Sequence, residues 1–491
     1  MLMFSAGKQT EGRLYSKRLV WDVNFVKKMY VINTLRVSLL STVIVAIASV
    51  PTANAESLRD ALASAYANNP ELGAERAQLR ATDEGVPQAL SGYRPNISAS
   101  ADYGGQRNNS ITIGKTGPTK SSNYVHPRGY SVSVTQNLFD GFRTYHRTAQ
   151  AEANVQAGRG VLLNTEQNVL LSAATAFLDV RRDLAITRLR TSNIEVLREE
   201  VKSTKARFDV GELTRTDVAQ AEARVSGAIS QLSAARANYA SSQAIYEQIV
   251  GRAPGTLASP PNMVAQLPRS IASAYSIAED EHPAIRSALF SVEANDRDID
   301  AIHGEFLPTL SVEGSYQERY EASGPDSYLD STTIMGRLTI PIYQAGAVSS
   351  RMRAAKQTST QRRLEVQNIR NQVRASVASA WAGLMATRAQ IVADNQQVRA
   401  AGVALDGVRQ EARVGQRTTL DVLDAQQEAL DAQVSLEITR RNEQVAIFNL
   451  LAALGKLNAD NLDLAVARYD PKINYDNVRS KWIGIDIDTF E

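Results

Sequence analysis

The chain contains no cysteine. Disulfide bonds and cysteine-ligated metal centres are therefore excluded, while the redox state of the compartment is left open. Aromatic residues make up only 6% of the 491 residues, against an ordinary hydrophobic share of 43%. This length is sufficient for more than one domain.

Charge of one sign is not in excess either. The sequence has 54 Lys and Arg, 52 Asp and Glu, and a formal net charge of +2. Seven of the basic and two of the acidic residues lie in residues 1–55, so the rest of the chain has 47 against 50 and a net charge of −3. A near-neutral chain is a poor candidate for nucleic-acid binding, and we expect no nucleic-acid partner.

The basic N-terminal segment has the features of an export signal. Lys27 and Arg36 precede the apolar run VSLLSTVIVAIASV, and an A-x-A sequence follows it. This order predicts a cleaved secretory signal peptide in residues 1–55. A transmembrane anchor is the alternative, but about 14 apolar residues fall short of the ~20 that a spanning helix needs. Met29 is a candidate for the true start, because a signal does not need the residues before it.

Long apolar runs are absent after this segment, where no stretch reaches 18 apolar residues. No transmembrane helix is therefore expected there, and any part that enters a membrane would have to consist of strands. Because no cysteine follows the predicted cleavage site, a lipid anchor at that site is excluded.

The sequence contains an internal repeat of about 200 residues. VGELTRTDVAQAEA, from Val210, returns as VGQRTTLDVLDAQQEA, from Val414. Matched residues are 213 positions apart early in the unit and 204 apart later, so the first copy has a longer loop. The matched pairs are Pro70 with Pro283, Pro95 with Pro308, Tyr103 with Tyr316, Gly211 with Gly415 and Gly251 with Gly455.

Each copy changes its periodicity in the same order. Apolar and alanine residues recur at helical spacing over 58–90 and 271–303, and two alternating segments joined by a polar loop follow. The alternation predicts one β-hairpin per copy, at about 94–139 and 307–343. Strands of about 9–11 residues have the length that crosses a bilayer at a tilt.

Proline-free helical segments follow both hairpins. The predicted long helices span 141–209 and 346–413, and shorter return helices span 214–251 and 418–455. A helix of 70 residues is about 105 Å long at 1.5 Å per residue. The helix before each hairpin and the return helix together nearly equal the long helix, which predicts two short helices stacked end to end beside each long one. An ordinary helical bundle is the alternative, but globular helices typically have about 8–20 residues.

These elements divide the chain into the signal peptide, a first repeat with a linker (56–270), a second repeat (271–455) and a tail (456–491).

Four strands in lipid would leave unpaired edges, so the sheet must close with other copies of the chain. Two chains give eight strands, and three give twelve, which is enough to begin a pore. A soluble hairpin with one solvated face is the alternative. The residues that suit a wet lumen are Ser98, Ser100, Asp102, Thr309, Ser311, Glu313 and Arg337.

The export signal, the duplicated order of hairpin, long helix, VG…T..DV..A motif and return helix, and the tail resemble the TolC family of outer-membrane channel proteins. The similarity is greatest to members that serve drug efflux and type I secretion in alpha-proteobacteria, and it covers nearly all of residues 56–465. The resemblance implies an α+β membrane protein with a duplicated repeat. It implies a homotrimer that forms a 12-stranded transmembrane β-barrel and a long periplasmic tunnel of antiparallel coiled-coil helices, with an equatorial C-terminal tail.

The same resemblance implies a function and partners. The protein would lie in the outer membrane and act as the passive exit duct of a tripartite efflux pump or type I secretion system for drugs, small toxic molecules or proteins. A periplasmic adaptor, an inner-membrane RND or ABC transporter and outer-membrane lipid would be its partners. A periplasmic coiled-coil adaptor or structural protein is the alternative function.

The repeated motif lies a full helix length from the strands, at the predicted periplasmic tip. Glycine suits a turn because it tolerates positive φ. Thr214 with Asp217, and Thr418 with Asp421, have the spacing of a capping box at a helix start. Capping explains these two aspartates without any further function, but it does not explain Asp424.

The resemblance also implies roles for the tip residues. Under threefold symmetry Asp421 and Asp424 would form two carboxylate rings, which match the family's acidic constriction and are candidates for block by cations. Asp217 and Arg417 match the family's latch, although Ala412 stands where the best-known member has a tyrosine. The positions that match the adaptor-docking tip are Val210, Gly211, Val414 and Gly415.

No catalytic constellation is evident. GxSxG, HExxH, P-loop and GxGxxG motifs do not occur in the context that each requires. We therefore expect neither an enzyme nor a cofactor or a resident metal. The four histidines are scattered along the chain, at His126, His146, His282 and His303.

Overall fold

The computed structural model describes residues 55–261 and 267–487, which belong to one unit, Ala53–Glu491. The predicted signal peptide and the candidate start Met29 therefore lie outside the described residues, apart from Ala55. Within the described ranges, no helix combines the length and the apolar character that crossing a membrane requires.

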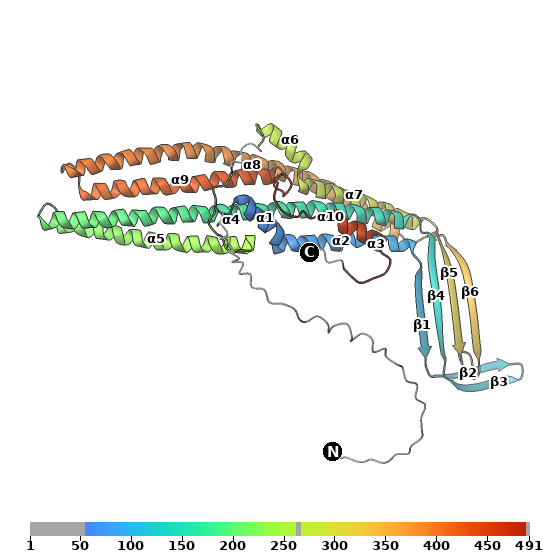
Figure 1. Ribbon diagram of the computed structural model, residues 1–491. Helices are drawn as coiled ribbons and strands as arrows, with labels where there is room; N and C mark the ends of the chain where they lie inside the picture. Colours follow the sequence, from blue (N-terminus) through green and yellow to red (C-terminus); the bar gives the residue numbers. More distant parts are fainter. Residues whose placement is uncertain (1–54, 262–266, 488–491) are drawn as a thin grey trace, which may run out of the picture. The chain divides into compact units, whose positions relative to one another are not determined.

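Two helices of 67 residues each are the longest elements, α4 (Arg143–Asp209) and α8 (Ala347–Arg413). Each leads through a tight turn into a shorter helix of 36 or 35 residues, α5 (Arg215–Val250) or α9 (Thr419–Ala453). The four helices lie side by side with both turns at the same end (Figure 1). Many of their buried residues are alanines, whose small side chains permit close packing of the helices. These helices confirm the predicted pattern of long and returning helices.

The short helices stack end to end along the long ones. The last turn of α5 meets the first two helices of its repeat, because Ser64 Oγ donates to Val250 O at 3.1 Å and Asn69 Nδ2 donates to Ile249 O at 3.0 Å. In the second repeat, Gly455 follows α9 and lies close to the backbone of His282. A Cβ added to Gly455 would be only 2.9 Å from the Cα of His282. Both contacts agree with the stacking that the helix lengths predict.

The helix predicted before each hairpin is broken at a proline, and the first one is interrupted again at Glu84. The first becomes α1 (Leu58–Asn68), α2 (Pro70–Asp83) and α3 (Gly85–Leu90), and the second becomes α6 (Ile271–Glu281) and α7 (Pro283–His303). The residue before a proline is disfavoured in helical conformation. The residues before Pro70 and Pro283 accordingly have extended ψ angles of 124° and 122°.

Four strands form one antiparallel sheet in the order β1 (Asn96–Tyr103), β4 (Arg128–Phe139), β5 (Thr309–Tyr320) and β6 (Tyr328–Thr339). The hairpins of the two repeats are joined through the β4–β5 pair. Strands β1 and β6 therefore form the two open edges of the sheet among the described residues.

The prediction of an irregular polar loop inside the first hairpin is wrong. Residues in it form a second hairpin, β2 (Gln106–Gly114) with β3 (Gly117–Val125), which makes a separate two-stranded sheet. The alternation was hidden because one face of this hairpin consists almost entirely of Gln, Asn, Ser and Thr. The long first loop is therefore a regular element.

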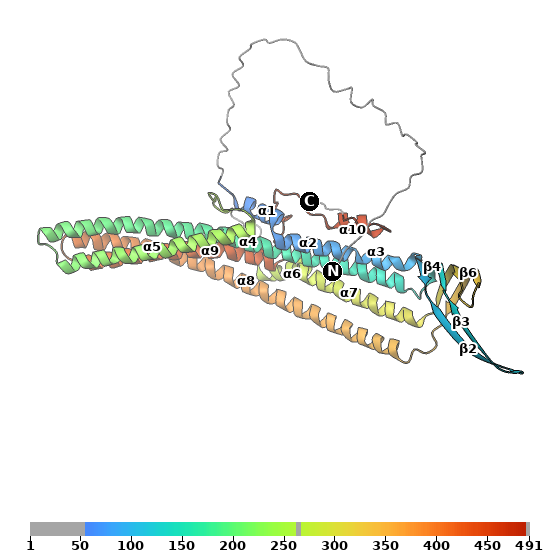
Figure 2. The ribbon, with the colours of Figure 1, turned by 90° about the horizontal axis from the view of Figure 1, so that it is seen from below.

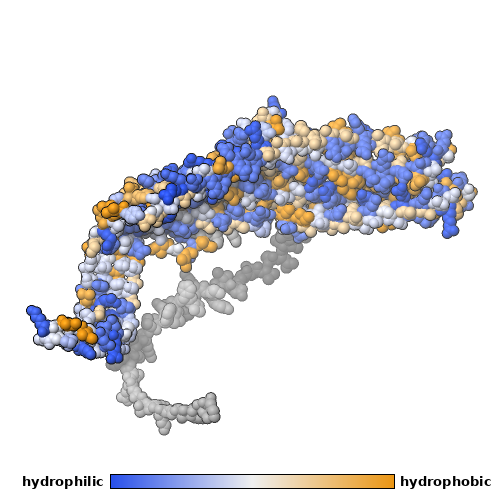
Figure 3. All heavy atoms as spheres, turned by 180° about the vertical axis from the view of Figure 1, so that it is seen from behind, coloured by the Kyte–Doolittle hydropathy of each residue, from blue (hydrophilic) through white to orange (hydrophobic). Residues whose placement is uncertain are grey.

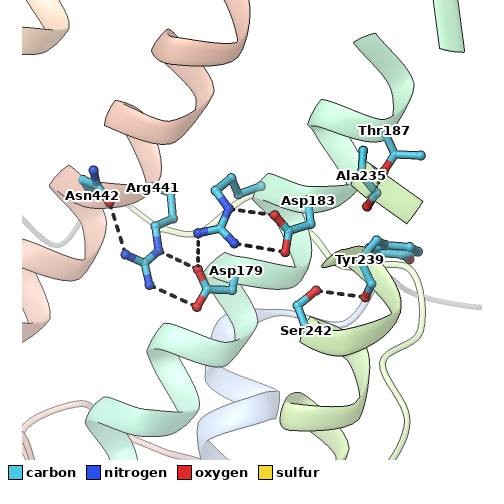
Figure 4. A network of polar contacts seen from close by, with 9 residues as sticks. Asp179, Asp183, Thr187, Ala235, Tyr239, Ser242, Arg441 and Asn442 are labelled. Carbon is cyan, nitrogen blue, oxygen red and sulfur yellow. Dashed lines mark hydrogen bonds and ion pairs between the residues drawn. The ribbon is translucent and has the colours of Figure 1, made fainter. Parts of the chain in front are cut away.

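Charged side chains join the two repeats along the helices. Arg441 of α9 forms an ion pair with Asp179 of α4, with an Nε–Oδ1 distance of 2.7 Å (Figure 4). Arg182 binds both Asp179 and Asp183 at 2.8 Å. These side chains are at most a quarter exposed, so the geometry of the pairs ties α4 to α9 at a defined register.

The C-terminal tail packs back onto the first repeat. Its helix α10 (Pro471–Arg479) lies against α2 (Figure 2). Asn474 Nδ2 donates to the buried carboxylate of Asp83 at 2.8 Å. Burial raises the pKa of Asp83 above its ordinary value.

Candidate functional site

The two tips are closed by the same backbone turn. Gly211 has φ 81° and its N–H donates to Phe208 O, while the next N–H donates to Arg207 O, both at 2.9 Å. Gly415, with φ 79°, makes the equivalent turn after α8. A left-handed glycine with this pair of bonds is the Schellman ending of a helix, which most other residues adopt only with strain.

The predicted docking residues are open to solvent. Val210 and Val414 are 73% and 71% exposed, and a Cβ added to Gly211 or Gly415 would meet nothing within 4 Å. Exposed valine beside bare backbone at both turns is an accessible apolar surface in this chain.

Asp217 and Asp421 each cap a return helix. An oxygen of Asp217 accepts from Thr214 N at 2.9 Å and Oγ1 at 2.7 Å, and Asp421 accepts from Thr418 N at 2.9 Å and Oγ1 at 2.8 Å. The hydroxyl and then the N–H of Thr214 lower the pKa of Asp217. The N–H and then the hydroxyl of Thr418, with the charge of Arg417, lower the pKa of Asp421. Both carboxylates are therefore ionised at neutral pH.

Asp424 has a partner that the sequence did not reveal. Arg224 of α5 forms an ion pair with it across the contact between the two return helices. The pair is partly exposed, with 39% and 57% of the two side chains accessible. The spacing of residues along α5 gives no signal for this partner, because the pair depends on how α5 packs against α9.

The structure does not bring Asp217 and Arg417 together within the chain. Arg417 Nε lies 2.9 Å from Glu411 Oε2, and this hydrogen bond raises the pKa of Arg417. Asp217 is bound within its own turn. The predicted latch therefore has no contact inside one chain and stays a prediction.

The sheet has two chemically different faces. On one face Arg337 binds Glu313 through two bonds of 2.9 and 3.0 Å, Arg319 binds Asp102, and Ser98 lies 2.8 Å from Ser133. This is the face of the predicted lumen residues. The opposite, apolar face carries Ile97, Ala99, Ala101, Val132, Val134, Leu310, Val312, Gly314, Ile334, Gly336 and Leu338.

Aromatic residues border the apolar face at both ends. At the end far from the helices, four tyrosine hydroxyls surround Glu318, with distances of 2.5 Å from Tyr130 and 3.3 Å from Tyr328. At the helix end, Phe139 and Phe142 meet edge to face at 5.2 Å, and Tyr93, Phe306 and Tyr343 are exposed. Two aromatic belts are typical of strands that cross a membrane, and the alternation of tyrosines around Glu318 was the signal for one of them.

Among the described residues, no three His, Asp or Glu side chains are grouped so as to hold a metal ion.

The model of the family described as "Outer membrane efflux protein" matches residues 61–252 and 274–456, once in each repeat. The chain belongs to this family.

Two relatives and one solved structure extend the comparison. The outer membrane efflux protein BepC of Brucella suis is 40% identical over 88% of this chain and 92% of its own. The outer membrane protein TolC of Escherichia coli is 27% identical over 83% of this chain and 84% of its own. The Campylobacter jejuni CmeC outer membrane channel has the same fold, with a TM-score of 0.71 and 16% identity over 87% of this chain and 89% of its own.

These findings confirm the predicted resemblance to the TolC family. This outer membrane efflux protein is an outer-membrane channel with a periplasmic helical part, and it provides the exit for an efflux or secretion system. The alternative of a periplasmic adaptor is thereby set aside. The family is one of channel proteins and not a known family of enzymes.

Proposed function

We propose that three copies of the chain close one β-barrel, in which β6 of each copy pairs with β1 of the next. The observation that carries this proposal is the four-stranded sheet with two open edges, one apolar face and one polar face. Three copies supply twelve strands, which leaves no edge in lipid and encloses a wet channel. From Leu310 to Tyr320 a strand tilted by about 45° rises roughly 24 Å, close to the apolar height of outer-membrane barrels.

The tips are the second part of the proposal. The open turns at Val210, Gly211, Val414 and Gly415 are the contact for a periplasmic adaptor, which connects the channel to an inner-membrane RND or ABC transporter. Their exposure and the absence of neighbours around both glycines support this assignment. Drugs, small toxic molecules or proteins pass from this complex to the exterior.

The third part of the proposal is a gate at the same tips. Asp421 and Asp424 of three copies form an acidic constriction that favours cations and is blocked by multivalent ones. Asp217 and Arg417 latch the closed tip between copies. Because Arg224 neutralises Asp424 within each chain, most of the free negative charge of the constriction belongs to Asp421.

Disulfide cross-linking tests the trimer, and the absence of native cysteine makes it clean. Ala99→Cys on β1 is combined in turn with cysteine at Thr332, Ile334 and Gly336 of β6, and outer membranes are oxidised. We expect a ladder that ends at the covalent trimer for one register. Ala99→Cys with cysteine at Leu310 of the central strand β5 is the matched control, which should give no ladder. Monomers only, in all three combinations, would contradict the trimer.

A further inference from the structure

The hairpin β2–β3 has one face that combines apolar and basic residues. Directly opposite residues of antiparallel strands share a face, so the register places Arg107 opposite Tyr124, Ile111 opposite Lys120 and Ile113 opposite Pro118. The polar pair Asn109 and Ser122 lies on the same face, between Arg107 and Ile111. Ile111, Ile113 and Tyr124 are 62%, 84% and 63% exposed. Figure 3 shows the resulting hydrophobic patch on the projecting hairpin. These side chains are called the apolar–basic face below.

The opposite face carries no charge, and its only apolar side chain is the buried Val125 at the base of the hairpin. The rest of this face consists of Gln106, Asn108, Ser110, Thr112, Thr119, Ser121 and Asn123. The whole segment 104–127 contains the cations Arg107, Lys115 and Lys120 and no Asp or Glu. Each chain thus presents three unopposed positive charges on one hairpin.

The hairpin is held at its base and stands free beyond it. His126 N donates to Glu321 at 2.9 Å, and Arg128 forms an ion pair with the same carboxylate at 2.9 Å. Figures 1 and 2 show the hairpin leaving the end of the four-stranded sheet and running to one side of it. Nine-residue strands reach about 30 Å, so the hairpin extends well beyond the strands that anchor it.

An isolated two-stranded hairpin with an exposed apolar face is at best marginally stable in water. The apolar–basic face therefore requires a covering surface, and its charge requires that surface to be anionic. We propose that this face lies on the phosphate layer of the membrane's outer leaflet, with the isoleucines and Tyr124 in the interface and the cations on lipid phosphates. The inference rests on the proposed barrel, because it places this end of the strands at the outer surface.

The test uses the full-length trimer, reconstituted in nanodiscs of zwitterionic phosphatidylcholine with or without 30% anionic phosphatidylglycerol. An environment-sensitive dye is attached to Ile113→Cys on the apolar–basic face or to Thr112→Cys on the opposite face. Quenching by neutral acrylamide measures the exposure of the dye. Heat-modified gel mobility of the same samples reports whether the trimer formed, so failure of the barrel is distinguished from failure of this inference.

We expect the dye at position 113 to be protected in anionic discs only, and the dye at position 112 to stay quenched in both. Lys115→Gln with Lys120→Gln should weaken the protection about fivefold per cation removed, and 0.5 M salt should act in the same direction. Equal quenching at both positions in anionic discs would overturn the proposal. Equal protection of position 113 in both lipids would also overturn it, since the cover of the face would then not depend on the net negative charge of the lipid surface.

Discussion

Asp421 and Asp424 lie only three residues apart, yet their carboxylates have different partners. Asp421 is bound to the N–H and hydroxyl of Thr418, whereas Asp424 is paired with Arg224. The capping role of Asp421 could be predicted from the sequence because the box spans four consecutive residues. The ion pair of Asp424 with Arg224 could not be predicted, because it depends on how α5 of one repeat packs against α9 of the other.

Removing Arg224 should therefore increase the negative charge at the tip. An exposed pair contributes little to folding, at most about 1 kcal/mol, so Arg224→Gln should leave the trimer intact. Release of three carboxylates should tighten block by a divalent cation about fivefold, which corresponds to roughly 1 kcal/mol for unit charges in water at close range. Single-channel recordings with added divalent cation measure this change.

Asp424→Asn in the Arg224→Gln background is the matched control. It removes the freed carboxylate, and block should return to the level of the unaltered channel. If Arg224→Gln leaves block unchanged, Asp424 does not face the conducting path.

At the scale of elements, the periodicity of the sequence predicted long helices, returning helices and four strands of one sheet. Two details were missed for physical reasons. Pro70 and Pro283 interrupt helices whose apolar spacing continues across them, and β2–β3 has too few apolar residues for its alternation to be recognised. The breaks are local, since a proline disfavours the helical conformation of the residue before it, and the extra hairpin is formed by the pairing of β2 with β3.

The cap of α9 gives a prediction with a pH dependence. Thr418→Ala should cost about 1 kcal/mol and increase opening of the first turn of α9 about fivefold at pH 7. Hydrogen exchange of residues 419–423 measures this opening. Thr360→Ala, at an exposed interior position of α8, should change local exchange far less.

The sign of the pH effect follows from Asp421. The pKa of Asp421 in the folded protein is lowered from its ordinary value of 3.8. The stabilisation of the cap by this carboxylate is therefore complete above pH 3.8, and it is lost as the pH falls through the folded pKa. The difference between the unaltered protein and Thr418→Ala should be constant from pH 7 to 5 and shrink below about pH 4. A difference that persists unchanged in acid would show that the carboxylate is not part of the cap.

The two faces of β4 give a second prediction at this scale. Val134 lies midway along the apolar face, and its neighbour Ser133 lies on the polar face. Val134→Arg should cost about 2–4 kcal/mol and reduce the folded trimer in outer membranes, as seen by heat-modified mobility. Ser133→Arg should fold and instead lower the cation selectivity of the channel. Equal folding of both variants would mean that the apolar face does not meet lipid.

At the scale of the whole molecule, two kinds of contact make the duplicated chain one structure. Strands β4 and β5 pair across the repeats, and Arg441 with Asp179 ties α9 to α4. The repeat itself was visible in the sequence, since Gly211 and Gly415 stand in the same motif. The closure of the open sheet edges and the contact of the tips involve other chains, so the pattern within one chain does not determine them.

Docking at the tips is tested by separating backbone conformation from added bulk. Gly211→Val with Gly415→Val places β-branched residues at φ angles near 80°, which strains both turns although the space around them is empty. We expect export to be lost while trimer and barrel persist, because the helices and the sheet do not depend on the tips.

Gly211→Asn with Gly415→Asn tolerates the left-handed conformation and should retain part of the export. Gly227→Val, on an exposed stretch of α5 with nothing within 4 Å and no positive φ, is the matched control and should export normally. Export is measured by accumulation of a fluorescent efflux substrate in cells and docking by co-purification of the adaptor. Normal export and co-purification in the double valine variant would place the adaptor contact elsewhere on the helices.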